Sequence, residues 1–288
     1  MGLCVLFSIP FYFAPSLLWA IGLIASGYAS GCGVAAWGYF LKAFTPKNER
    51  LRSCADVLIL SNILMIAINV TSEIWSPFAA LSFALTCIPL GFFFIFLLPL
   101  NFNPTSEATT RYEKPLKRDH PLWILFLFIF IITINSGLMY QVINPAFEHL
   151  TGLVSWYWAV PYILALVILR FLPLDRKRSP VLYIGMGMIM AAFISFMLLG
   201  RGGVDYLIVD TLMLGACGIF DLFWWSILGE MLEYTNNPAK IFGIGLSANV
   251  LGVLCGDVIG IAVTSAGMPS AEIAVIALCI VCITLVLL

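Results

Sequence analysis

The chain has 288 residues, of which 62% are hydrophobic and only 10% are charged, and its mean hydropathy is +1.05. A soluble domain carries about 25% charged residues, so this composition excludes an ordinary soluble protein. Within lipid only helices and closed barrels satisfy the backbone, and the apolar runs here are continuous over ~20 residues rather than short alternations. The composition therefore predicts an all-α, polytopic membrane protein whose partner is the lipid bilayer. The net charge of −1 offers nucleic acid no overall attraction.

Taken in chain order, the apolar runs predict about nine full spans plus one partial span. Residues 1–14 are apolar but too short to cross the bilayer, as expected for the end of a helix whose beginning is absent. We expect full spans at 16–43, 54–72, 77–100, 121–143, 153–173, 180–199, 204–230, 241–266 and 271–288. The only long polar connection is 101–120. We expect the chain to be a fragment at both ends.

The basic residues predict the orientation. Thirteen of the fourteen Lys and Arg fall on alternate connections or beside them, and only Arg201 lies on the opposite side. The positive-inside bias makes the basic side cytoplasmic, including the loop 101–120 and the C-terminus. Glu73 and Glu148 then fall on the outer side. Asp56, which begins a span after a basic loop, is expected to pair with Arg52 or to cap its helix.

An internal repeat relates 29–64 to 216–251. A shift of 187 residues without gaps aligns Trp37 with Trp224 and Asn62 with Asn249. Both pairs lie at equivalent places in a unit of span, basic turn and span. Units repeated with the same orientation imply an axis along the membrane normal, as between the halves of certain transporters.

Two similar halves around a cytoplasmic loop resemble the major facilitator superfamily, whose fold is two six-helix bundles. The resemblance implies an incomplete N-terminal bundle at 1–100 that lacks the first two helices, a central loop at 101–120, and a six-helix C-terminal bundle at 121–288. The segment LDRKR, residues 174–178, is similar to a degenerate copy of the family's cytoplasmic loop motif. Asp175 and Arg176 match that motif.

A narrower resemblance rests on the segments DLFWWSILGE, residues 221–230, and NPAKIFGIGLSAN, residues 237–249. They resemble parts of the facilitator-like membrane module of bacterial LuxR-type regulators. This resemblance implies the bacterial cytoplasmic membrane. It also implies an alternative function, in which the module senses a ligand for a DNA-binding domain beyond this chain, while this segment itself binds no nucleic acid.

Acidic side chains within the last spans are the main site candidates, because each costs ~3 kcal/mol to insert at the centre of a span. Asp210 and Asp221 fall on one stripe of the span 204–230, and Trp224 continues that stripe. Asp221 has to be protonated, paired with a polar group such as Asn249 at similar depth, or facing water. Asp221 is therefore either a functional site residue or a structural polar contact between helices. Asp257 lies at a depth comparable with Asp210, so the two either share a site or are separate interfacial acids.

Asn135 and Gln141, in the outer half of the span 121–143, complete the candidate set. Gly252, Gly256 and Gly260 recur at four-residue spacing, which favours a packing groove. No nucleophile elbow, phosphate-binding glycine loop or zinc spacing occurs, so we expect no enzyme, metal or cofactor. The first hypothesis is a secondary transporter of a small apolar or cationic solute, with or without proton coupling. The alternative is the ligand-sensing module.

Overall fold

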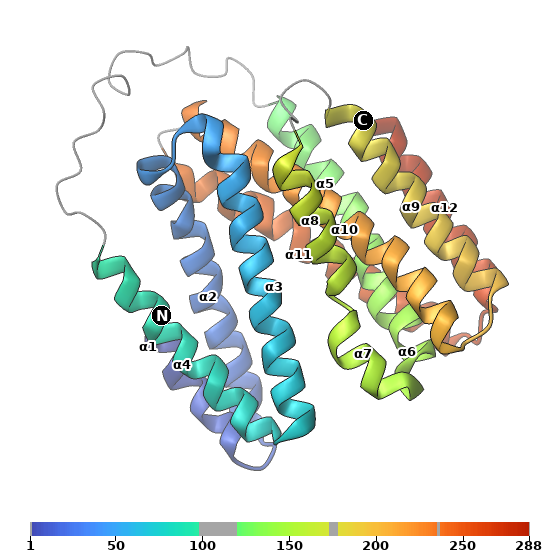
Figure 1. Ribbon diagram of the computed structural model, residues 1–288, viewed down its shortest axis with the longest axis horizontal. Coiled ribbons are helices and arrows are strands. Elements are labelled where there is room, and N and C mark those ends of the chain that lie inside the picture. Colours follow the sequence, from blue (N-terminus) through green and yellow to red (C-terminus); the bar gives the residue numbers. More distant parts are fainter. Residues whose placement is uncertain (1, 98–119, 173–177, 235–236, 288) are drawn as a thin grey trace.

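A computed structural model describes residues 2–97, 120–172, 178–234 and 237–287. Every regular element in those ranges is helical (Figure 1). The helices are α1 (Gly2–Ser8), α2 (Leu17–Phe44), α3 (Arg50–Ile74), α4 (Pro77–Phe96), α5 (His120–Leu138), α6 (Asn144–Ala146), α7 (Thr151–Tyr157), α8 (Val160–Phe171), α9 (Arg178–Leu198), α10 (Gly203–Met231), α11 (Pro238–Ser265) and α12 (Ser270–Leu287). Short 3-10 turns at Ile9–Tyr12, Lys47–Glu49, Glu148–Leu150 and Leu232–Tyr234, and a π-helical turn at Met139–Ile143, complete the described elements.

Eight helical segments are long and apolar enough to cross a membrane, which confirms an all-α polytopic membrane protein. α12 falls just short of that length, so the count of nine full spans stays a prediction. Large apolar side chains such as Leu17, Trp75 and Phe96 are more than two-thirds exposed, as lipid-facing positions require. The segment 98–119, which holds most of the predicted central loop, and the pair Asp175 and Arg176 lie outside the described residues.

Local sequence signals begin two of the spanning helices. Ser76 caps α4 by accepting a hydrogen bond from the Ala79 amide, and Pro77 occupies the first helical position. Asn237 caps α11 in the same way through the Lys240 amide, with Pro238 first in the helix. A side-chain acceptor followed by proline supplies a partner for an unpaired amide and presets the helical φ angle.

The helices form two groups (Figure 1). The N-terminal group comprises α1 to α4, where α1 packs on α2 and α4, and α3 packs on α4. The C-terminal group comprises α5 to α12, where α10 packs on α8 and α9, and α12 packs on α5 and α9. Most of the buried apolar core lies in the C-terminal group, around α5, α9 and α10.

The two groups meet through reciprocal helix pairs. α2 packs against α11, and α3 packs against α10. The predicted repeat equates α2 with α10 and α3 with α11, so a two-fold operation would exchange these two contacts. This reciprocity is what duplicated units related by an axis through their interface would produce. The repeat itself remains a sequence prediction that the packing supports.

Candidate functional site

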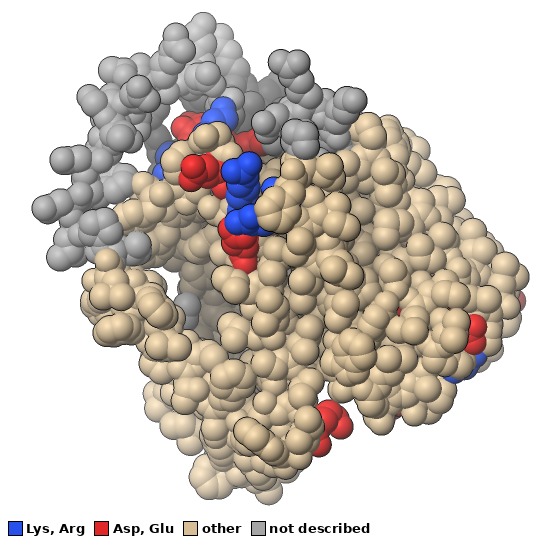
Figure 2. Space-filling model, in the orientation of Figure 1, with Lys and Arg blue, Asp and Glu red and all other residues tan. Residues whose placement is uncertain are grey.

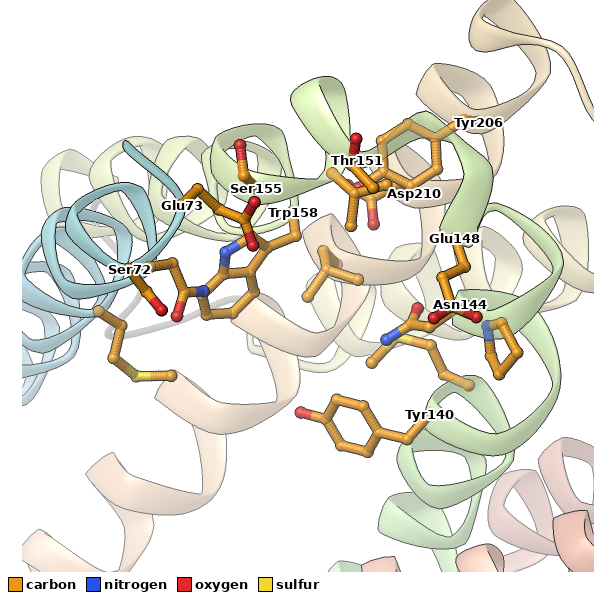
Figure 3. A pocket seen from close by; sticks show the side chains of 16 residues that line it. Ser72, Glu73, Tyr140, Asn144, Glu148, Thr151, Ser155, Trp158, Tyr206 and Asp210 are labelled. Carbon is orange, nitrogen blue, oxygen red and sulfur yellow. The ribbon is translucent and has the colours of Figure 1, made fainter. Parts of the chain in front are cut away.

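A cavity of about 750 Å³ opens between the two groups. Its walls come from the C-terminal half of α3, the segment that follows α5, the helix α7, and the N-terminal third of α10 (Figure 3). With the orientation predicted from the basic residues, all these segments lie toward the outer side. We call this space the outer cavity. Its volume falls within the range of roughly 300–1,000 Å³ that small-molecule sites occupy.

Two interruptions in helical geometry shape the wall. The π-helical turn Met139–Ile143 follows α5 directly, and Pro145 then ends regular hydrogen bonding within two residues. A π-helical turn rotates the side chains that follow it, and such turns are frequent at functional sites. The second interruption separates α7 from α8 just ahead of Pro161, and it places Trp158 on the cavity wall.

The outer cavity carries acidic and aromatic chemistry. Its acids are Glu73, Glu148 and Asp210, and its aromatic side chains are Tyr140, Trp158 and Tyr206 (Figure 3). Smaller polar groups are Asn69, Ser72, Asn144, Thr151 and Ser155. Among the described residues, no Lys, Arg or His lines this space. The wall therefore concentrates negative charge in a partly enclosed region.

Asp210 is the most deeply placed acid of this wall. The residue is only 4% exposed, and its Oδ2 is buried without a hydrogen-bond partner among the described residues. Tyr206, one turn earlier on α10, is 3% exposed, and its hydroxyl is likewise unpartnered. The two side chains are close enough to interact electrostatically, although their geometry falls short of a regular hydrogen bond. Buried polar groups are normally bonded, so each one left over at a cavity calls for an explanation.

Asp221 lies about three turns further along α10, in a different environment. The Tyr162 hydroxyl donates to its Oδ2 at 2.8 Å, and Trp224 Nε1 donates to its Oδ1 at 3.0 Å. Asp221 and Trp224, which were predicted to lie on one stripe of the helix, are thus in direct contact. Of the three alternatives for Asp221, pairing with a polar group holds, but the partner on another helix is Tyr162 of α8 rather than Asn249. The main-chain oxygen of Asn249 accepts a hydrogen bond from the Thr133 hydroxyl of α5 at 3.2 Å.

The remaining polar candidates fall into two separate places. Asn135 is 1% exposed, and its Oδ1 has no partner in the described part of the chain. It shares with Asp221 the wall of a pocket of about 20 Å³, which has room for one water molecule. Gln141 Nε2 donates to Asp257 Oδ1 at 3.3 Å. Asp257 does not line the outer cavity, so it is not paired with Asp210 there. Tyr140, on the cavity wall, lies close enough to interact electrostatically with both Asp221 and Asp257.

Removal of the Tyr162 hydroxyl tests the Asp221 cluster. Tyr162→Phe leaves Asp221 Oδ2 without its donor in a buried setting, which costs about 1–3 kcal/mol for a group left unsatisfied. We expect a lower melting temperature in detergent. Tyr183→Phe is the matched control, because Tyr183 is 54% exposed on α9. Equal melting temperatures for the two variants would mean that the hydrogen bond from Tyr162 to Asp221 does not contribute to stability.

At the opposite end from the outer cavity the two groups are in direct contact. Trp37 of α2 packs edge-on against Trp225 at 5.2 Å and Phe242 at 5.4 Å between ring centroids. Arg50, only 3% exposed, forms an ion pair with Glu233 at 2.6 Å and donates to the main-chain oxygen of Gly229 at 2.8 Å. We call this set the inner contact. Figure 2 shows the charged side chains gathered mainly at one end of the molecule, with largely uncharged surface elsewhere on that face.

Asp56 also belongs to the boundary between the groups. Its carboxylate accepts from Arg170 Nε at 2.5 Å and from Arg170 Nη2 at 3.1 Å, so α3 is linked to α8. The expected pairing with Arg52 or capping role is therefore wrong. The basic residue that pairs with Asp56 is 114 positions away, so spacing along one helix gave no sign of it.

Several members of the site escaped sequence reasoning. Tyr206 was detectable in principle, because it precedes Asp210 by one helical turn. Glu73 was expected only on the outer side, and Trp158, Tyr162 and Arg50 were not singled out, because their neighbours in the site lie on other helices. Asp210, Asp221 and Trp224 lie where the spacing suggested, along one helix.

The fold and the cavity define the class: an integral membrane protein of packed helices with an acidic, aromatic cavity between two groups. A scan against models of protein families finds no match, and searches of curated proteins and of solved structures find none either.

Proposed function

We propose that this protein is a secondary transporter of a small solute, of the facilitator type, located in the bacterial cytoplasmic membrane. The solute enters the outer cavity and crosses as the two helix groups rock against one another. The site offers positioning and charge rather than a nucleophile or an acid–base pair, so the proposal is transport rather than an enzymatic reaction. A repeated unit on each side of the pathway is the arrangement that alternating access uses.

One observation carries the proposal. An open cavity lies between the groups on the outer side, whereas at the other end they are in contact through the ring cluster of Trp37 with Trp225 and the Arg50 to Glu233 pair. A transporter that waits for its solute on one side needs this asymmetry. The second state would break the inner contact and narrow the outer cavity. Bistable packing of this kind turns a small local event into a rigid-body movement.

The acids supply two roles in this scheme. Asp210 lies in the wall of the cavity with a free acceptor, so it contacts the solute. Asp221 is already bonded through both carboxylate oxygens, and it lies deeper in the span. Its place is coupling, where a change of protonation or of the Tyr162 bond accompanies the rearrangement. Tyr140 joins the two regions, because it lines the cavity and interacts with Asp221.

Uptake into proteoliposomes tests the proposal. The purified full chain is reconstituted and offered a panel of radiolabelled amines, sugars and carboxylic acids. We expect one chemical class to enter faster than into protein-free liposomes, and Asp210→Asn to reduce that uptake by about tenfold or more, as loss of a charge-assisted bond predicts. Asp205→Asn is the matched control: it alters an acid five residues away that caps α10 through the Gly202 amide.

The ligand-sensing alternative gives a different result in the same preparation. A sensing module would bind a member of the panel, lose that binding in Asp210→Asn, and show no accumulation inside the vesicles. Binding without uptake would therefore overturn the transport proposal and favour the sensor.

A further inference from the structure

The outer cavity has the charge of a cation site. Three acids reach it from three different elements, namely Glu73 from α3, Glu148 from the turn before α7, and Asp210 from α10 (Figure 3). No basic side chain among the described residues lines the space to neutralise them. A cleft lined by one sign of charge with apolar walls concentrates ions of the opposite sign. An anionic solute would meet repulsion throughout this space.

A cluster of acids alone does not make a site, but buried unsatisfied groups point to a ligand. Asp210 Oδ2 and the Tyr206 hydroxyl are both buried at the cavity wall without a partner among the described residues. A carboxylate of this kind accepts hydrogen bonds only. A ligand that donates an N–H group and carries positive charge would satisfy it and offset the cost of its burial. The fixed, unpaired acceptor on a rigid helix is therefore the specific part of the site.

The aromatic residues define the rest of the ligand. Tyr140, Trp158 and Tyr206 stand around the same space as the acids (Figure 3). Aromatic faces attract ammonium groups and also pack against flat apolar rings. The cavity volume of about 750 Å³ exceeds what a simple ammonium ion needs. The site thus suits an amine that carries an aromatic body.

A bare metal ion fits this arrangement poorly. No three His, Cys, Asp or Glu side chains in the described parts of the chain come close enough together to hold a metal. Tight metal sites need several such ligands converging at 2–2.6 Å, roughly speaking, around one point. The three acids here surround a space instead. They act by long-range attraction, with Asp210 as the single direct acceptor.

We propose that the outer cavity binds a small aromatic amine in its protonated form, with the Asp210 carboxylate as its counter-ion. The ammonium donates to Asp210 Oδ2, and the ring lies against Trp158 and Tyr140. Glu73 and Glu148 attract the cation toward the opening. The identity of the solute rests on the transport function proposed above, whereas the binding itself is measured independently of transport.

Three probes of matched size test the charge requirement. Phenethylamine is a cation at neutral pH, phenethyl alcohol is its neutral analogue, and hydrocinnamate is its anionic analogue. Radiolabelled phenethylamine is titrated onto the purified full chain in detergent micelles and measured by equilibrium dialysis. We expect saturable binding that unlabelled phenethylamine displaces and that the alcohol and hydrocinnamate do not. Asp210→Asn should weaken the binding by about tenfold or more, because the charge-assisted bond is lost.

Two further variants make the result decisive. Glu73→Gln combined with Glu148→Gln removes only exposed charges, so folding is preserved, and we expect affinity to fall by about two- to fivefold through weaker Coulomb attraction. Asp205→Asn, outside the cavity, should bind like the parent protein. Melting temperatures confirm that each variant is folded.

Three outcomes would overturn the inference: no saturable binding of phenethylamine, displacement by the alcohol as effective as by the amine, or undiminished binding in folded Asp210→Asn. Failure of the transport proposal is distinguishable from these. Charge-selective binding without uptake into vesicles leaves this inference standing and removes transport. Uptake of a neutral or anionic solute that is insensitive to Asp210→Asn leaves the transport proposal standing and removes this inference.

Discussion

Gly256→Ala is expected to destabilise the protein by about 3 kcal/mol, the upper end of the usual range for overpacked positions. A Cβ atom on Gly256 would overlap the main-chain oxygen of Ile134 and lie 2.9 Å from the Cα of Gly137. Both neighbours are backbone atoms of α5, so no flexible side chain can move aside. The helices α5 and α11 would have to separate. Thermal melting in detergent, with unfolding in mixed micelles for the free energy, measures the effect.

The expected effect is this large because the two helices pack against each other in lipid rather than in water. Lipid tails are as apolar as the side chains, so helices in a membrane associate through close packing rather than through the hydrophobic effect. The α5–α11 contact is built on this closeness, since Gly252 and Gly137 also leave no room for a Cβ atom. Close packing along the groove predicted from Gly252, Gly256 and Gly260 is therefore confirmed, with Gly260 against the side chain of Gln141 just beyond α5. Its partner, α5, was not predicted.

Gly31→Ala on α2 is the matched control. Nothing lies within 4 Å of a Cβ atom built there, and glycine is a poor helix former. We expect this change to be neutral or to stabilise the protein by up to about 1 kcal/mol. If both glycine variants melted alike, the close approach of α5 to α11 would be refuted.

Arg50→Ala is expected to cost about 2–4 kcal/mol, between the value of a surface pair and that of a fully buried pair. Arg50 is 3% exposed and bonds to Glu233, to Gly229 O and, through Nε at 3.3 Å, to Thr45 O. Its loss leaves the Gly229 oxygen unpaired at a helix boundary between the two groups. Glu233 is 38% exposed and returns to solvent, which limits the loss. Detergent melting curves give the measurement.

Asp56→Asn provides the comparison for Arg50→Ala. The Asp56 and Arg170 side chains are 45% and 31% exposed, so solvent screens the pair, and we expect a change within experimental error. Because Arg50 belongs to the inner contact, its loss should also shift the two helix groups away from the arrangement seen here. A cavity-binding measurement on Arg50→Ala is expected to show weaker phenethylamine binding although the cavity wall is untouched. A melting temperature for Arg50→Ala equal to that of Asp56→Asn would contradict the proposed importance of the inner contact.

Properties that belong to a single helix were predicted reliably from the amino-acid pattern. Composition and run length predicted helical spans, because lipid permits little else. Helical periodicity placed Asp210, Asp221 and Trp224 along one stripe of α10, and Asp221 does meet Trp224. The repeat of 29–64 and 216–251 finds support in the reciprocal packing of α2 on α11 and α3 on α10. The two-bundle facilitator fold and the resemblance to LuxR-type membrane modules stay predictions.

Partners on other helices were decided only by the tertiary structure. Asn249 looked like the match for Asp221 by depth, but depth does not fix the rotation of a helix about its axis. Tyr162 of α8 supplies the bond instead. From the sequence Asp210 was either a site residue or an interfacial acid, and the π-helical turn after α5 and the break before α8 place a cavity beside it. The sequence by itself determined that acids lie within apolar helices; packing decided that Asp221 is satisfied and Asp210 is not, because hydrogen bonding depends on angles and distances between helices that no single-helix pattern contains.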